Sequence, residues 1–139
     1  MNRLIGHLKG LRKNRGLQFS WHYLKFNSVK DTFPKYETHL DVACGPGTFI
    51  GNFLDNRSVG VDIAKRQISY AKNNYPEFKN QFYQKDVNIE IEDLNKYDVV
   101  ILAVNHIEYE EFYTGDWISQ NQVIFDVKSV IQSDKVLSL

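Results

Sequence analysis

The sequence predicts an α/β fold in which one parallel sheet of about five strands is covered by helices on both faces. Short apolar runs alternate with stretches of helical spacing, as in successive βαβ units. The run VVILAV at residues 99–104 is apolar at every position, which suits a central parallel strand buried on both faces. With 139 residues, of which 42% are hydrophobic, the chain is large enough for one well-packed core.

The first 35 residues are expected to form a helical, basic extension. Apolar and aromatic residues at roughly helical spacing, Trp21, Tyr23, Leu24 and Phe26, indicate one or two helices, and Pro34 breaks the pattern. Basic residues outnumber acidic ones here, which could favour an anionic ligand. The simpler interpretation is a solvated helix face, so nucleic acid is not expected as a partner. The sheet domain is then expected at residues 36–139.

The strands and helices of this second domain follow from the alternation of apolar runs and helical stretches. The expected strands are His39–Ala43, Ser58–Asp62, Gln81–Gln84, Asp98–Val104 and Val123–Val127. The expected helices are Thr48–Leu54 and Ala64–Asn74, the second ended by Asn-Asn-Tyr-Pro.

A glycine turn follows the first strand, in the stretch LDVACGPGTF. In parallel sheets ligands bind beyond the carboxyl ends of the strands, where Gly45 and Gly47 lie. Glycine can adopt positive φ and lets the backbone approach a ligand closely. Asp62 closes the second strand, where a carboxylate can accept both hydroxyls of a ribose. Together the turn and the acid predict a ligand of the adenosine type.

Two details argue against a dinucleotide. The spacing of Gly45, Gly47 and Gly51 is one residue longer than in the dinucleotide fingerprint. Asp41, inside the first strand, would repel a pyrophosphate, whereas a ligand that carries an ammonium and a sulfonium tolerates it.

LDVACGPGTF and VGVDIA resemble the first two motifs of class I S-adenosylmethionine-dependent methyltransferases, over about Leu40 to Val104. The resemblance implies a Rossmann-like fold, S-adenosylmethionine as cofactor, and methyl transfer to an oxygen or nitrogen of a small, for example sugar-like, acceptor. Ala43 stands where the family has its first glycine. The acceptor itself is not identified.

The resemblance also assigns roles to individual residues. The turn would hold the methionine part of the cofactor, with Asp62 at the ribose and Ile63 near the adenine. Asp86 and Val87 would meet the adenine edge, and His106 beside Asn105 would face the substrate as the candidate base. The implied cofactor-binding residues are Asp41, Ala43, Gly45, Gly47, Asp62, Ile63, Asp86 and Val87. Asp86 as a helix cap and His106 as a surface residue remain the plainer alternatives.

The tail from Tyr97 to Ile131 carries a second resemblance. YDVVILAVNHIEYEEF and VIFDVKSVI are similar to the C-terminal UDP-binding domain of UDP-sugar dehydrogenases. The thiol nucleophile of those enzymes has no counterpart, because the only cysteine, Cys44, lies in the glycine turn. The chain is therefore interpreted as a small methyltransferase truncated at its C-terminus, or as a hybrid joined near residue 97. Either origin predicts a parallel sheet.

The remaining expectations concern the alternative to catalysis, self-association, metal sites and cellular location. A non-catalytic nucleotide-binding module is the main alternative to an enzyme, and an exposed sheet edge would favour self-association into a homo-oligomer. One cysteine excludes an internal disulfide and gives no zinc pattern, so no metal site is expected. No leader or membrane span is recognised, so we expect no membrane association and a cytoplasmic protein.

Overall fold

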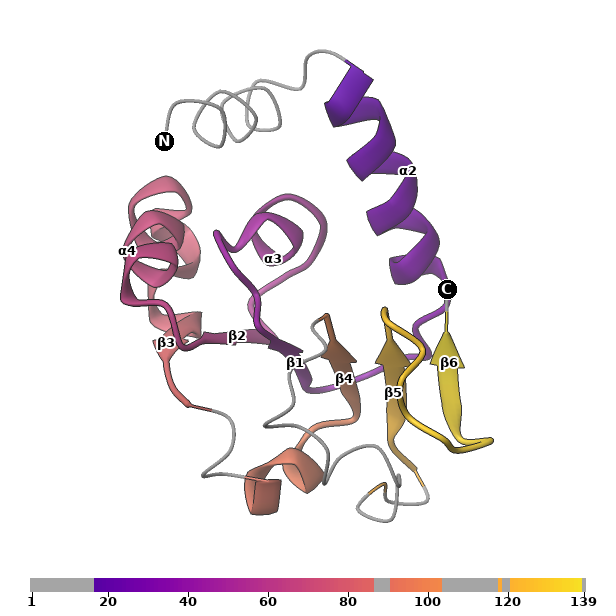
Figure 1. Cartoon of the computed structure of the whole chain (residues 1–139). Coiled ribbons are helices and arrows are strands. Elements are labelled where there is room, and N and C mark those ends of the chain that lie inside the picture. The colour runs from indigo at the N-terminus through magenta and orange to yellow at the C-terminus, as the bar shows by residue number, and fades with distance from the viewer. Residues whose placement is uncertain (1–16, 87–90, 104–117, 119–120, 139) are drawn as a thin grey trace. The chain divides into compact units, whose positions relative to one another are not determined.

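The computed structural model describes residues 17–86, 91–103, 118 and 121–138 (Figure 1). The chain divides into two units, Met1–Thr32 and Phe33–Leu139. The first unit contains helix α2 (Leu17–Asp31), which lies within the range of the helical extension expected over residues 1–35. The second unit contains the sheet and the helices that pack on it.

In the described part of the chain, six parallel strands form the sheet, in the order β3-β2-β1-β4-β5-β6. They are β1 (His39–Val42), β2 (Ser58–Asp62), β3 (Phe82–Gln84), β4 (Val99–Leu102), β5 (Val123–Asp126) and β6 (Val136–Ser138). The α/β class and the parallel sheet are thus confirmed, with one strand more than expected. Since β3 and β6 form the edges, self-association through an edge stays a prediction.

One face of the sheet carries the larger apolar core. Side chains alternate between the faces of a strand, so Leu40 and Val42 of β1 point to this face together. Leu94 of the 3₁₀ helix η3 (Ile91–Lys96) packs into the same core. The buried members of this core are Leu40, Val42, Val61, Leu94, Val100, Leu102, Ile118, Ile124 and Ile131.

The opposite face is covered by α3 (Thr48–Phe53), α4 (Lys65–Asn74) and the 3₁₀ helix η1 (Pro76–Gln81). Figure 1 shows α3 and α4 on the same side of the sheet. Their buried core comprises Cys44, Ile50, Ile68, Ala71, Tyr75 and Phe82. The expected helices are therefore present, whereas the two 3₁₀ helices had no recognisable signal in the sequence.

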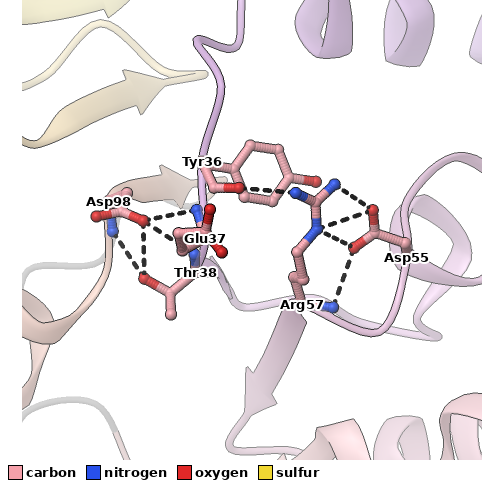
Figure 2. Close-up of polar contacts among 6 residues, drawn as sticks. All are labelled: Tyr36, Glu37, Thr38, Asp55, Arg57 and Asp98. Atoms are coloured by element: carbon pink, nitrogen blue, oxygen red, sulfur yellow. Dashed lines mark hydrogen bonds and ion pairs between the residues drawn. The ribbon is translucent and has the colours of Figure 1, made fainter.

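Polar contacts fix the chain where it enters β1 (Figure 2). The Asp98 carboxylate accepts hydrogen bonds from the backbone N–H groups of Glu37 and Thr38, at 2.8 and 3.0 Å. These bonds hold the pKa of Asp98 below its usual range. Nη2 of Arg57 forms an ion pair with Oδ2 of Asp55 at 2.6 Å, and Cζ of Arg57 lies 4.7 Å from the centre of the Tyr36 ring. Both groups lie at the amino end of the sheet, opposite the glycine turn.

Among the helices that the structure describes, none has the length and apolar composition needed to cross a membrane.

Candidate functional site

The turn after β1 is built from left-handed residues at alternate positions. Ala43, Gly45 and Gly47 have φ angles of 58°, 55° and 70°. The Cys44 N–H donates to the carbonyl of Val61 at 3.0 Å, so the pairing of β1 with β2 continues into the turn. The N–H of Gly47 then donates to the carbonyl of Cys44 at 3.1 Å and closes the turn just before α3 begins.

Ala43 occupies a conformation that alanine rarely adopts. Left-handed backbone costs an L-residue with a Cβ roughly 1–2 kcal/mol. The sequence marks Ala43 as a departure from the glycine of the family motif. Its positive φ of 58° supplies the physical reason why glycine suits this position.

Exchange of Ala43 for glycine is expected to raise the free energy of unfolding by up to about 1 kcal/mol. Relief of the strain outweighs the additional freedom that glycine gives the unfolded chain, which costs about 0.4–1 kcal/mol. Chemical denaturation measures the change. Ala71→Gly, at a buried position within α4, is the matched control and should lower stability. A similar loss in both variants would contradict the prediction.

Asp62 ties this turn to the end of β2. Its Oδ2 accepts the N–H of Gly45 at 2.8 Å, and its Oδ1 accepts the N–H of Ala64 at 2.8 Å. The residue is only 9% exposed. A carboxylate offers about four lone-pair positions, so each oxygen can accept one further hydrogen bond. Asp62 can therefore order the turn and bind two hydroxyl groups of a ligand simultaneously.

Asp41 lies beneath the turn and is only 4% exposed. No hydrogen-bond donor to its carboxyl group lies among the residues that the structure describes. Burial, together with the charge of Asp62, raises the pKa of Asp41 to about 7. Burial and these two acids also raise the pKa of the Cys44 thiol, which disfavours a reactive thiolate. The site therefore favours a ligand that carries positive charge.

The two glycines of the turn have different surroundings. A Cβ on Gly45 would meet nothing within 4 Å. A Cβ on Gly47 would lie 2.6 Å from the Phe82 ring and 2.9 Å from the Cβ of Ala71. Gly45 therefore borders open space, whereas Gly47 is required by the packing of α4 and β3.

The outer residues of the expected site are only partly described. Ile63 follows Asp62 directly and is 63% exposed, which is unusual for a large apolar side chain. Asp86 lies two residues beyond β3 and is exposed. Val87 and His106, with its neighbour Asn105, lie outside the described residues.

Two groups that order the loops at the carboxyl edge of the sheet were not recognised from the sequence. The backbone N–H of Ala64 is the second donor that holds Asp62, and no residue type signals a backbone donor. Asp126, at the end of β5, is fully buried and accepts backbone N–H groups of Lys128, Val130 and Ile131. Asp126 thus orders a second loop at the carboxyl edge of the sheet.

Among the described residues, no group of His, Cys, Asp and Glu side chains is arranged to hold a metal ion.

Known proteins resemble this chain in sequence and in fold. Residues 40–115, more than half of the 139, match the family described as "Methyltransferase domain". The structure is similar to the crystal structure of a SAM dependent methyltransferase from Archaeoglobus fulgidus, with 20% sequence identity and a TM-score of 0.48. The alignment covers 73% of this chain and 47% of that one, so this chain spans about half the length of that structure. No curated protein matches the sequence. The resemblance of Tyr97–Ile131 to UDP-sugar dehydrogenases has no support among these matches.

Proposed function

Because this chain belongs to the methyltransferase domain family, we propose that the turn after β1 binds S-adenosylmethionine for methyl transfer to a small acceptor. The acceptor atom would be an oxygen or a nitrogen. The observation that carries the proposal is the contact of the Asp62 carboxylate with Gly45, which borders open space, together with the buried acid Asp41 whose charge acts on Asp62.

The acids fit the two polar parts of this cofactor. The free lone pairs of Asp62 suit the two ribose hydroxyls, because its other lone pairs already hold backbone N–H groups. Asp41 places a buried negative charge near the turn, where the ammonium and sulfonium of the methionine part would balance it. The open side of Gly45 gives the ligand room to approach the backbone.

The adenine would lie beyond β2 and β3. Ile63 offers an exposed apolar surface to one face of the ring, directly after the ribose-binding acid. Asp86 is exposed after β3, the position that the family resemblance assigns to the adenine amino group. Val87 would lie beside it by the same resemblance.

Bound S-adenosylmethionine supplies a methyl group made electrophilic by its sulfonium. The chain itself must orient the acceptor and remove a proton from it where the acceptor loses one. His106 remains the candidate for that base on sequence grounds alone. The turn and its two acids would hold the cofactor while the acceptor approaches from the carboxyl edge of β4 and β5.

Exchange of Asp62 for alanine is expected to weaken binding of S-adenosylhomocysteine at least about 30-fold, or about 2 kcal/mol. The variant loses charge-assisted hydrogen bonds to the ribose, each contributing about 1.5–3 kcal/mol, and loses the bond that holds Gly45. Calorimetric titration of purified protein measures the change. Thermal unfolding of the free variant shows whether the fold is intact.

Asp134→Ala provides the control, since Asp134 is an exposed acid in the turn before β6. It should bind with the affinity of the unaltered protein. Asp62→Asn serves as a second variant that keeps the side-chain shape and one acceptor oxygen, and it should fall between the two. An unaltered protein that gives no binding heat at any temperature tested would refute the proposal. Equal affinity in Asp62→Ala and Asp134→Ala would remove Asp62 from the site.

A further inference from the structure

A buried polar pair lies at the end of the sheet opposite the candidate cofactor site. His39 is the first residue of β1 and Ser58 the first residue of β2, and the two are register partners. Both are 0% exposed. Their neighbours Leu40 and Val59 belong to the larger core, so alternation directs both His39 and Ser58 to the α3 side of the sheet.

Aromatic rings surround the imidazole of His39. The ring centres of Phe33, Tyr36 and Phe49 lie 5.3, 6.0 and 6.3 Å from it. Burial among these rings lowers the pKa of His39 to about 3, although the charge of Asp55 opposes this shift. The imidazole is therefore neutral at pH 7, with one nitrogen that donates and one that accepts.

The polar atoms of these two side chains are unpartnered within the part of the chain that the structure describes. Among the residues that the structure describes, neither ring nitrogen of His39 nor Oγ of Ser58 makes a hydrogen bond. Buried side-chain polar atoms in folded proteins nearly always have a partner, and ordered water supplies it where the chain does not. Three unpartnered atoms on two register partners therefore indicate a ligand that is small, neutral and able to donate and accept.

We propose that an internal water molecule bridges His39 and Ser58 beneath α3. Neighbouring strands lie about 4.8 Å apart, so register partners that point to the same face can both reach one water molecule. Water can accept from or donate to either the imidazole or the hydroxyl. The aromatic rings around His39 and the full burial of both residues exclude a larger or charged ligand. This site is independent of the proposed function.

The direction in which Ser58→Ala changes the stability of the protein tests the proposal. If a water molecule is bound, the variant removes one of its partners, and the unfolding equilibrium constant should rise at least about fivefold. The same change in a His39→Phe background should have little effect, which gives a coupling of at least about threefold between the two positions. If the site is dry, Ser58→Ala removes only an orphaned hydroxyl, so stability stays unchanged or increases.

Ser138→Ala is the matched control, because Ser138 is an exposed serine in β6. Its unfolding equilibrium constant should stay within error of the unaltered protein. A crystal structure at high resolution gives the second readout, in which density should lie within about 3.2 Å of both Ser58 Oγ and a ring nitrogen of His39. Absence of that density, or a neutral or stabilising Ser58→Ala, would overturn the proposal.

Discussion

Exchange of Gly47 for alanine is expected to lower the free energy of unfolding by about 4 kcal/mol, whereas Gly45→Ala should lower it by only about 1–2 kcal/mol. Both positions have a positive φ, so both variants incur backbone strain. Only Gly47 adds a steric conflict, because its Cβ would lie 2.6 Å from the Phe82 ring. Since Phe82 is fully buried, the ring cannot move without disturbing the core around it.

Chemical denaturation of the two variants measures this difference in stability. Ligand binding should show the opposite order, with Gly45→Ala as the variant that loses more affinity. Gly45→Ala keeps the fold but projects a methyl group into the open space of the candidate cofactor site, so it should weaken binding of S-adenosylhomocysteine. Phe82→Leu, combined with Gly47→Ala, should recover part of the lost stability, because a smaller side chain leaves room for the added Cβ. Equal losses of stability at both glycines would contradict the assigned packing.

This pair of glycines shows where sequence reasoning stops. In the sequence Gly45 and Gly47 belong to one motif and both indicate a turn that approaches a ligand. Their different surroundings depend on Phe82, which lies 35 positions after Gly47 in the chain and reaches it only through the strand order. A motif records which backbone conformations are needed, but tertiary packing decides what each glycine contacts.

The sheet was predictable because its strands are short apolar runs bounded by turn residues. The bounds expected for β1, β2, β4 and β5 differ from the observed ones by two residues or fewer at each end. Strand β6 was missed because Val136–Ser138 is only three residues long and two of its side chains are exposed. Such a strand exists because β5 offers it a backbone to pair with, not because of its own pattern.

The acids of the candidate site were found from their positions at or near strand ends. The sequence could indicate that Asp41 and Asp62 lie near the turn, because parallel neighbours end at the same edge. It could not reveal that Asp41 is nearly inaccessible, or that His39 and Ser58 are register partners. Burial and register result from the packing of α3 and of neighbouring strands, which no local pattern encodes.

Exchange of Asp41 for asparagine is expected to stabilise the protein by about 4 kcal/mol at pH 8.5 and by only about 1 kcal/mol at pH 4.5. The pKa of Asp41 is about 7 in the folded protein and near 3.8 in the unfolded chain. Because the folded-state pKa is the higher one, its favourable contribution is present below pH 3.8 and is lost as the pH rises through 7. Asparagine keeps the shape but cannot ionise. Denaturation at both pH values measures the difference.

The pH dependence must be compared between variants rather than followed in the unaltered protein alone, because His39 also changes its protonation in this range. Its pKa is lowered to about 3 in the folded protein, so its contribution is complete above pH 6.5 and is lost as the pH falls toward 3. The two residues therefore change stability in opposite directions over the same range and partly cancel. His39→Phe is the control and should gain stability relative to the unaltered protein as the pH falls. A constant difference between Asp41→Asn and the unaltered protein across this range would contradict the burial of an ionisable acid.

The same residue connects stability to the proposed function. If an ammonium binds beside Asp41, it favours the ionised carboxylate and lowers its pKa, so binding near pH 6 must release a proton. Titrations with S-adenosylhomocysteine in buffers of different ionisation enthalpy would reveal that proton, and Asp41→Asn should abolish it while also weakening binding. Binding without proton release would place the ammonium away from Asp41. The excess stability of Asp41→Asn at pH 8.5 would then remain as the cost of a buried charge that serves the ligand only indirectly.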